Sequence, residues 1–159
     1  MDKRAIIKQF AVLLAADLAV ITQAALATRE GAIHAESKAE DQYDTRGLEA
    51  SYLAGAQSKR AMELEATLNL FRHIDIKDFG PATAIASTAL IELECAGHKS
   101  YCLMMPKAGG KAVIFAGKSI HCITPQSPLG EAVLGRVMGD EVSLERNGVA
   151  KDYVITRVW

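Results

Sequence analysis

Hydrophobic positions in the first half of the chain recur in alternating steps of four and three residues. Such steps average 3.5 residues, which is the period of a seam between two supercoiled helices. The first series runs through Ile7, Ala11, Leu14, Leu18, Ile21, Ala25, Thr28 and Ala32. The second series runs through Ala50, Ala54, Gln57, Ala61, Leu64, Leu68 and Phe71. The pattern therefore predicts two long helices that pack on each other along these positions.

The apolar spacing lapses between the two series, over residues 33–44. No proline occurs before Ile74, and alanine, leucine, glutamate and lysine dominate, which is the composition of helices. Two helices separated by a short break most simply fold back as an antiparallel hairpin, with arms about 45 Å long. The alternative is an ordinary helical pair inside a globular bundle, which explains the seam equally well but leaves the second half of the sequence unexplained.

After Ile76 the hydrophobic period changes to two, which is typical of strands. Residues 77–81 contain the glycine and proline of a linker. Candidate strands follow at residues 88–95, 100–105, 112–115, 141–145 and 153–158. Asn147-Gly148 between the last two favours a tight hairpin, because both residues tolerate positive φ. The second half therefore predicts a small antiparallel sheet.

One short helix is predicted among the strands. Ser127 is a favourable N-cap, Pro128 suits the first helical position, and Gly135 can end the helix. The fold class is therefore α+β. It combines a coiled-coil hairpin over residues 1–76 with a β domain and one short helix over residues 80–159.

Composition and charge limit the function. Half of the 159 residues are hydrophobic, so the chain can bury a core without disulfides. The formal net charge of -1 lacks the basic excess that non-specific phosphate binding requires. We expect no independent DNA binding, and we expect any contact with nucleic acid to be made through a partner protein. Cys95, Cys102 and Cys122 are odd in number and form no C-x-x-C pair, which favours buried reduced thiols.

The N-terminus is apolar but does not have the pattern of a signal peptide. Lys8, Gln9 and Asp17 interrupt the apolar run, and no small-residue cleavage site follows it cleanly. No uninterrupted apolar stretch reaches the ~18 residues that span a membrane. We expect a cytoplasmic protein without a membrane partner.

The C-terminal half carries several motifs in a defined order. Ser127-Pro128-Leu129-Gly130 and Leu134-Gly135 are followed by Gly139-Asp140-Glu141-Val142 and then by Tyr153-Val154-Ile155. This order resembles the C-terminal domain of the bacterial Gre transcript-cleavage factors. With an N-terminal hairpin of matching size, the resemblance covers nearly the whole chain. The alternative is that any capped helix between strands needs serine, proline and glycine at such places.

The resemblance implies a fold and a partner. The fold is an FKBP-like β domain, and the partner is RNA polymerase. The β domain docks at the rim of the polymerase secondary channel, and Ser127, Pro128, Leu129 and Gly130 form the docking segment. The coiled coil reaches down the channel, so the nascent RNA is met only within the polymerase complex. No stand-alone enzymatic activity is expected.

The break between the helices is acidic, with carboxylates at Glu36, Glu40, Asp41 and Asp44. Carboxylate oxygens are favoured ligands of Mg²⁺, and two neighbouring metal ions can activate water for phosphodiester cleavage. The resemblance implies that such acids complete a weakly held Mg²⁺ site of the polymerase. Glu36, Glu40 and Asp41 are the candidate ligands, in the complex only, and the isolated protein is expected to bind no metal. Asp44 is the fourth catalytic candidate, and the N-cap of the second arm is its alternative role.

The acidic segment departs from the pattern of the family. If the family tyrosine is aligned with Tyr43, Glu36 takes the first essential acid position but Ala39 takes the second. If the family aspartate is aligned with Asp41, Asp44 takes the second. A non-cleaving regulator in the same channel is therefore the main alternative, and a stand-alone FKBP-like binding module or isomerase is a third.

Two basic residues of the second arm are further candidates. Lys59 and Arg60 could contact RNA or the channel wall, although exposed charges on the flank of a coiled coil are ordinary.

Overall fold

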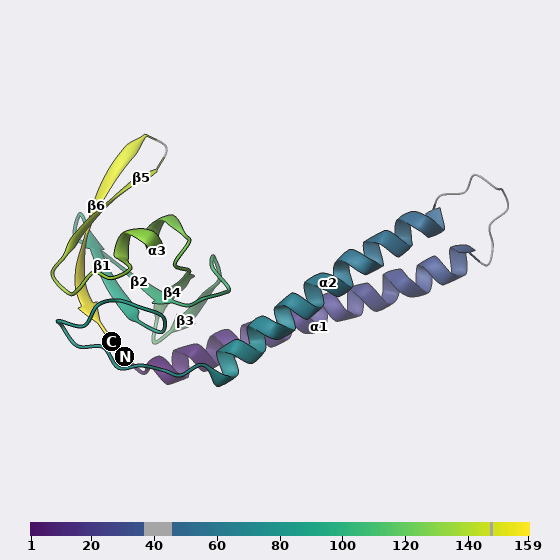
Figure 1. The fold of residues 1–159 in the computed structure, drawn as a ribbon, viewed down its shortest axis with the longest axis horizontal. Coiled ribbons are helices and arrows are strands. Elements are labelled where there is room, and N and C mark those ends of the chain that lie inside the picture. Colours follow the sequence, from purple (N-terminus) through teal and green to yellow (C-terminus); the bar gives the residue numbers. More distant parts are fainter. Residues whose placement is uncertain (37–45, 147) are drawn as a thin grey trace. The chain divides into compact units, whose positions relative to one another are not determined.

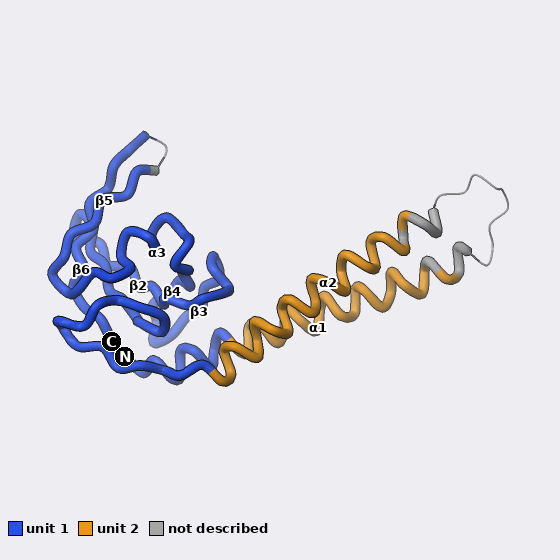
Figure 2. Tube along the Cα trace, in the orientation of Figure 1, with its two compact units in different colours: residues 1–10, 74–159 blue, residues 11–73 orange. Residues whose placement is uncertain are grey.

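The computed structural model describes residues 1–36, 46–146 and 148–159, which form two compact units (Figure 2). One unit contains Met1–Phe10 and Ile74–Trp159, and the other contains Ala11–His73. The start of the first helix thus groups with the β-rich part of the chain. The α+β fold class predicted from the sequence is confirmed (Figure 1).

Two long helices run side by side (Figure 1), α1 (Lys3–Glu36) and α2 (Arg46–His73), and the second unit contains α2 and the part of α1 from Ala11 onward. Burial within it follows the predicted seam. The described seam positions are buried or half-buried, and most positions between them are exposed. The most buried seam side chains from Ala11 to His73 are Leu14, Leu68 and Phe71. The predicted pairing of the two arms along this seam is therefore confirmed.

Local signals explain where α1 begins. Asp2 precedes the helix, and its Oδ1 accepts a hydrogen bond of 3.0 Å from the backbone N–H of Ala5. A side chain at this place satisfies one of the N–H groups that the first turn leaves without a helical partner.

By length and composition alone, one helix of the described part of the chain could cross a membrane, namely residues Lys3–Gly31 of α1. A core helix or a signal sequence meets the same criterion, so the expected absence of a membrane partner stays a prediction.

The β-rich unit contains a six-stranded sheet of order β3-β4-β2-β1-β6-β5 among the described residues. Its strands are β1 (Leu90–Cys95), β2 (His98–Met104), β3 (Ala112–Phe115), β4 (Lys118–Ile123), β5 (Glu141–Arg146) and β6 (Val149–Val158). The short helix α3 (Pro128–Val133) lies between β4 and β5 in the sequence. The FKBP-like assignment of this unit remains a prediction.

The sheet is mixed where the sequence predicted an antiparallel one. The pairings are antiparallel except that β2 and β4 are parallel, with Tyr101 opposite Ile120. After β2 the chain crosses to the edge strand β3, and it then turns back so that β4 lies between β3 and β2. The strand β4 was missing from the sequence prediction. Ala116-Gly117, both at positive φ, form the turn that leads into it.

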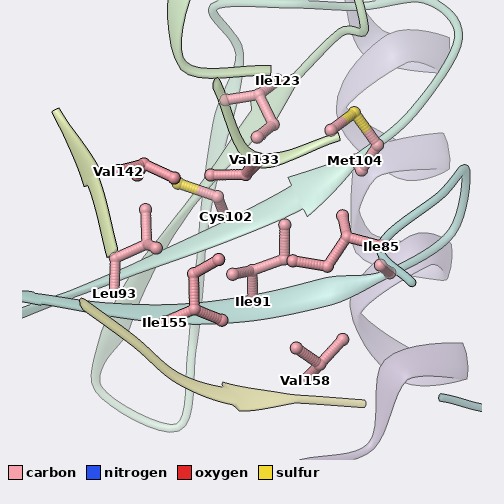
Figure 3. Close-up of a cluster of buried hydrophobic side chains, with 11 residues drawn as sticks. Ile85, Ile91, Leu93, Cys102, Met104, Ile123, Val133, Val142, Ile155 and Val158 are labelled. Carbon is pink, nitrogen blue, oxygen red and sulfur yellow. The ribbon is translucent and has the colours of Figure 1, made fainter. Parts of the chain in front are cut away.

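The core of this unit lies on one face of the sheet (Figure 3). Side chains of β1, β2 and β6 point toward one another and meet Val133 of α3 and Ile85 of the preceding loop. The opposite face is covered as well, because Leu90, Leu103 and Ile120 are fully buried. The alternation of residues 88–95 predicted that every second side chain would be exposed. Instead, Leu90–Leu93 are all buried. A sheet covered on both faces removes the contrast between inward and outward positions.

Lys3 connects three distant parts of the β-rich unit. Its Nζ donates hydrogen bonds to the backbone oxygens of Lys77 and Trp159 and lies 4.8 Å from the ring centroid of Phe79. Burial lowers the pKa of Lys3, and the charge of Asp78 partly opposes this effect. A lysine at the start of α1 thus binds the linker and the residue that follows β6.

Candidate docking surface and acidic segment

The predicted signals at the start of α3 are confirmed. Ser127 has the extended conformation of an N-cap (φ −77°, ψ 150°) and Pro128 occupies the first helical position. The Oγ of Ser127 accepts a hydrogen bond of 3.1 Å from Gly130 N and donates one of 2.8 Å to Thr124 O. Proline loses nothing here, because the first N–H groups of a helix have no helical acceptor.

Gly130 is required by close packing rather than by its dihedral angles. A Cβ at this position would lie 1.8 Å from the backbone oxygen of Thr124, which no side chain can tolerate. At the other end of the helix, Gly135 has φ +77° and donates its N–H to Ile85 O at 2.9 Å. The Ser-Pro-Leu-Gly segment therefore has a complete local explanation as a tightly seated helix start.

A cavity of about 520 Å³ lies beside this helix start and gives the segment a surface that a partner could use. Pro128 is exposed and Leu129 is half-buried, and both line the cavity together with Ser127. Gly130 is buried behind them and does not line it. The other lining residues are Gly110, which lies just before β3, and residues of β4, β5 and β6: His121, Cys122, Ile123, Leu144, Glu145, Lys151 and Tyr153. A hollow of this size with a few charged groups suits an inserted side chain or a small ligand.

Sequence reasoning missed the side of the cavity formed by β5 and β6. Leu144 pairs with Lys151 in the β5–β6 hairpin. Both residues line the cavity together with the start of α3. The Asn147-Gly148 signal predicts a two-residue turn, and counting outward from such a turn pairs residue 144 with residue 151. The pairing could thus have been derived, but the approach of the hairpin to α3 could not. Asn147 itself lies outside the described residues.

A second hollow of about 600 Å³ lies at the β1–β2 turn and is more polar. Among its lining residues are Cys95, His98, Lys99, Lys151 and Asp152. Its charged lining residues are Lys99, Lys151 and Asp152, so it carries charges of both signs.

The predicted catalytic acids are only marginally covered by the structure. Glu36 is the last residue of α1, and its side chain is outside the described part. Glu40, Asp41 and Asp44 lie outside the described residues altogether, as does Tyr43. Elsewhere in the described ranges, no group of three or more histidine, cysteine, aspartate or glutamate side chains could hold a metal ion. The predicted Mg²⁺ ligands therefore stay predictions.

Lys59 and Arg60 are both exposed on α2, away from the seam. Their predicted contact with RNA or the channel wall is neither strengthened nor weakened by this position.

The cysteines are free thiols, as predicted. Burial raises the pKa of Cys102 and of Cys122 to about 12. Both are therefore unreactive at neutral pH. Cys95 is half-buried.

A buried carboxylate that sequence reasoning did not single out lies in the middle of the sheet. Glu92 is only 4% exposed, and its Oε1 accepts hydrogen bonds of 2.9 Å from Lys99 Nζ and from Thr156 Oγ1. Burial opposes its ionisation, but hydrogen bonds from Lys99, Thr156 and Tyr101 outweigh burial and lower the pKa of Glu92. The group is fully engaged inside the fold, so we assign it a structural role.

Among known proteins, the chain is similar to solved structures only. No protein-family model and no curated protein matches the chain. The Gfh1 protein (GreA factor homolog 1) of Thermus thermophilus is 20% identical, with 94% of each chain covered and a TM-score of 0.38. Gfh1 of Thermus aquaticus is 21% identical, with 91% of this chain and 90% of that chain covered and a TM-score of 0.40. The elongation factor GreA/GreB from Nitrosomonas europaea is 22% identical, with 62% and 78% covered and a TM-score of 0.38.

Proposed function

We propose that this chain is an RNA polymerase-binding transcription elongation factor of the Gre type. The observation that carries the proposal is the burial of one continuous seam between α1 and α2. It makes the N-terminal part an antiparallel arm whose two helices are joined, in the sequence, by the acidic segment. A chain that combines a long paired arm with a separate β-rich unit suits a factor that docks on a large enzyme and reaches into it.

In this proposal the arm enters the secondary channel of the polymerase, and its acids supply ligands for Mg²⁺. Glu36, Glu40 and Asp41 hold a second metal ion that the polymerase alone holds weakly, and Asp44 is the fourth candidate. A carboxylate at that place could also orient the attacking water. The factor by itself is then catalytically silent, because the remaining ligands and the RNA belong to the polymerase complex. Lys59 and Arg60 would contact the RNA or the channel wall.

The β-rich unit supplies the dock, and the cavity beside α3 is its centre. Exposed Pro128 and half-buried Leu129 form an apolar rim, and Glu145 and Lys151 add one charge of each sign. This combination suits an apolar side chain of the polymerase with polar neighbours, since protein interfaces combine a dry centre with a polar rim. The cellular location that follows is the cytoplasm, and the net charge of -1 agrees with nucleic-acid contact only through the polymerase.

A second function is favoured by the acidic segment itself. When Tyr43 is aligned with the tyrosine of the family, Ala39 stands where the family has an essential acid. A chain without that acid could occupy the channel and modulate initiation or elongation without cutting RNA.

One assay separates these functions. Stalled, backtracked elongation complexes of the cognate polymerase are incubated with the protein and Mg²⁺, and RNA shortening is followed. Cleavage that is lost in Glu36→Ala, Glu40→Ala or Asp41→Ala, but kept in the matched exposed acid variant Glu63→Ala, supports the cleavage factor. Competition with another channel-binding factor without shortening supports the regulator. Failure to bind polymerase contradicts both.

A further inference from the structure

The outward faces of α1 and α2 differ in polarity. The exposed residues of α2 include the charged side chains Lys59, Arg60, Glu63 and Glu65. In α1, the stretch between Lys8 and Arg29 contains the single charge of Asp17, which is half-buried. The outer side of α2 thus carries more charge than that of α1, although the apolar side chains of Tyr52, Leu53 and Met62 are also exposed on α2.

Large apolar side chains stand exposed along α1. The exposed fractions are 64% for Val12, 68% for Val20, 56% for Leu26 and 56% for Ile33. Alanines separate them, among them the exposed Ala19. Val12, Leu26 and Ile33 lie within about 60° of one another around the helix, whereas Val20 is turned away from them. Apolar side chains that share a face of a helix whose other side is already packed mark an interaction surface. The small residues between them let another helix approach closely.

The outer face of α1 is symmetric in character about Ala19. Val12 and Leu26 lie equally far from Ala19 along the chain, and so do Lys8 and Glu30. At 3.6 residues per turn, all four lie within about 20° of the line through Ala19 along the helix. Along this line the order is therefore positive, apolar, small, apolar and negative, and Ala15 and the polar Gln23 lie beside the line.

We propose that α1 pairs through this face with α1 of a second copy of the chain, in antiparallel orientation, with the two-fold axis near Ala19. In that arrangement each residue meets the one equally far on the other side of the axis. Val12 then packs on Leu26 of the second copy, and Lys8 meets Glu30 at both ends. A parallel arrangement would instead place Lys8 beside Lys8 and Glu30 beside Glu30. Charge complementarity thus favours a second copy of α1 as the partner, in antiparallel orientation. In such a two-fold contact each copy contributes the same surface.

The expected affinity is modest, because one pair of helices buries less than the area typical of permanent dimers. Sedimentation equilibrium of the full chain should show a monomer–dimer equilibrium with a Kd that is roughly micromolar. Leu26→Lys should raise this Kd by about tenfold or more, because it places two charges in the apolar centre. Met62→Lys, which replaces a 64% exposed methionine of α2, is the matched control and should change the Kd by less than about twofold.

Charge exchange tests the direction of pairing. Lys8→Glu and Glu30→Lys should each raise the Kd by about threefold to tenfold at low salt, and the double variant should return it to within about twofold of the wild type. The proposal is overturned by a monomer at all concentrations, by equal effects of Leu26→Lys and Met62→Lys, or by a double variant as weak as the single ones. It is also overturned if the monomer binds phosphatidylcholine–phosphatidylglycerol vesicles through Leu26, since the face would then serve a lipid surface.

Discussion

The Nζ atom of Lys99 lies 2.9 Å from Oε1 of Glu92, and only the lysine reaches water to any extent. The side chain of Lys99 is 51% exposed and that of Glu92 is 6% exposed. The contact raises the pKa of Lys99. Together with the hydrogen bonds from Thr156 and Tyr101, it also lowers the pKa of Glu92 despite burial. A single half-exposed lysine thus helps to hold a carboxylate in the middle of the sheet.

Glu92→Gln should destabilise the β-rich unit at neutral pH by about 1–3 kcal/mol, because it disturbs a buried group that accepts several hydrogen bonds. A carboxylate whose folded pKa is lowered stabilises the fold above its unfolded pKa of about 4.3, and this contribution is lost as pH falls through the folded pKa. The difference between variant and wild type should therefore shrink below about pH 4.3.

Urea unfolding followed by the fluorescence of Trp159, the one tryptophan of the chain, measures this effect. The exposed acid variant Glu141→Gln is the control and should change stability by less than about 0.5 kcal/mol. A difference for Glu92→Gln that stays constant from pH 7 to pH 3 would contradict the assigned role of the charge.

Gly130→Ala should be the most damaging single change at the docking segment. The new Cβ would meet the Thr124 oxygen, a backbone atom that cannot move aside cheaply, so we expect a loss of about 3 kcal/mol or more. Gly135→Ala is the matched control, because its added Cβ meets nothing within 4 Å and its strain comes from φ +77° alone. That variant should lose about 1 kcal/mol. Equal losses in thermal unfolding would show that packing at Gly130 is not the cause.

Lys3→Met should destabilise the β-rich unit by about 1–3 kcal/mol. It keeps the apolar stem but removes the hydrogen bonds to the backbone oxygens of Lys77 and Trp159. Lys107→Met, at an exposed position of the same unit, should change stability by less than about 0.5 kcal/mol. The urea midpoint of unfolding, followed by the fluorescence of Trp159, compares the two variants. Similar midpoints would show that the hydrogen bonds of Lys3 do not stabilise the unit.

Gln57→Leu should stabilise the helical arm by about 1 kcal/mol. Gln57 occupies a seam position, and its Oε1 is buried without a hydrogen-bond partner among the described residues. Leucine replaces the unsatisfied oxygen with apolar surface that suits the seam. Thermal unfolding followed by helical circular dichroism should show a higher midpoint. The exposed neighbour Arg60→Leu should leave it nearly unchanged, and a lower midpoint for Gln57→Leu would mean that the oxygen has a partner.

The sequence predicted the helical arm well because its pattern is local and regular. The seam positions between Ala11 and Phe71 whose side chains the structure describes are buried or half-buried, and few positions off the seam join them. The start of α3 was predictable for the same reason, since Ser127 and Pro128 act on the residues next to them.

What the sequence did not predict depends on unusual turns and distant contacts. The strand β4 follows Ala116-Gly117, and β2 follows Ala96-Gly97, where alanine adopts positive φ. Alanine gives no turn signal, so both turns were invisible as motifs. The bonds of Lys3 to residues 77 and 159 and the cavity walls from β5 and β6 depend on tertiary contacts that no local spacing encodes.

The most direct test of the central claim asks whether the arm enters the polymerase while the β-rich unit docks outside. A photoreactive amino acid is placed at Gln42, between the candidate acids, and a second variant carries it at the exposed Glu131 of α3. In backtracked complexes of the cognate polymerase, Gln42 should crosslink to the RNA 3′ end or to the protein around the catalytic Mg²⁺, and Glu131 should crosslink to the polymerase surface only. Crosslinks from Gln42 to the outer surface, or none from either position, would contradict the proposed function.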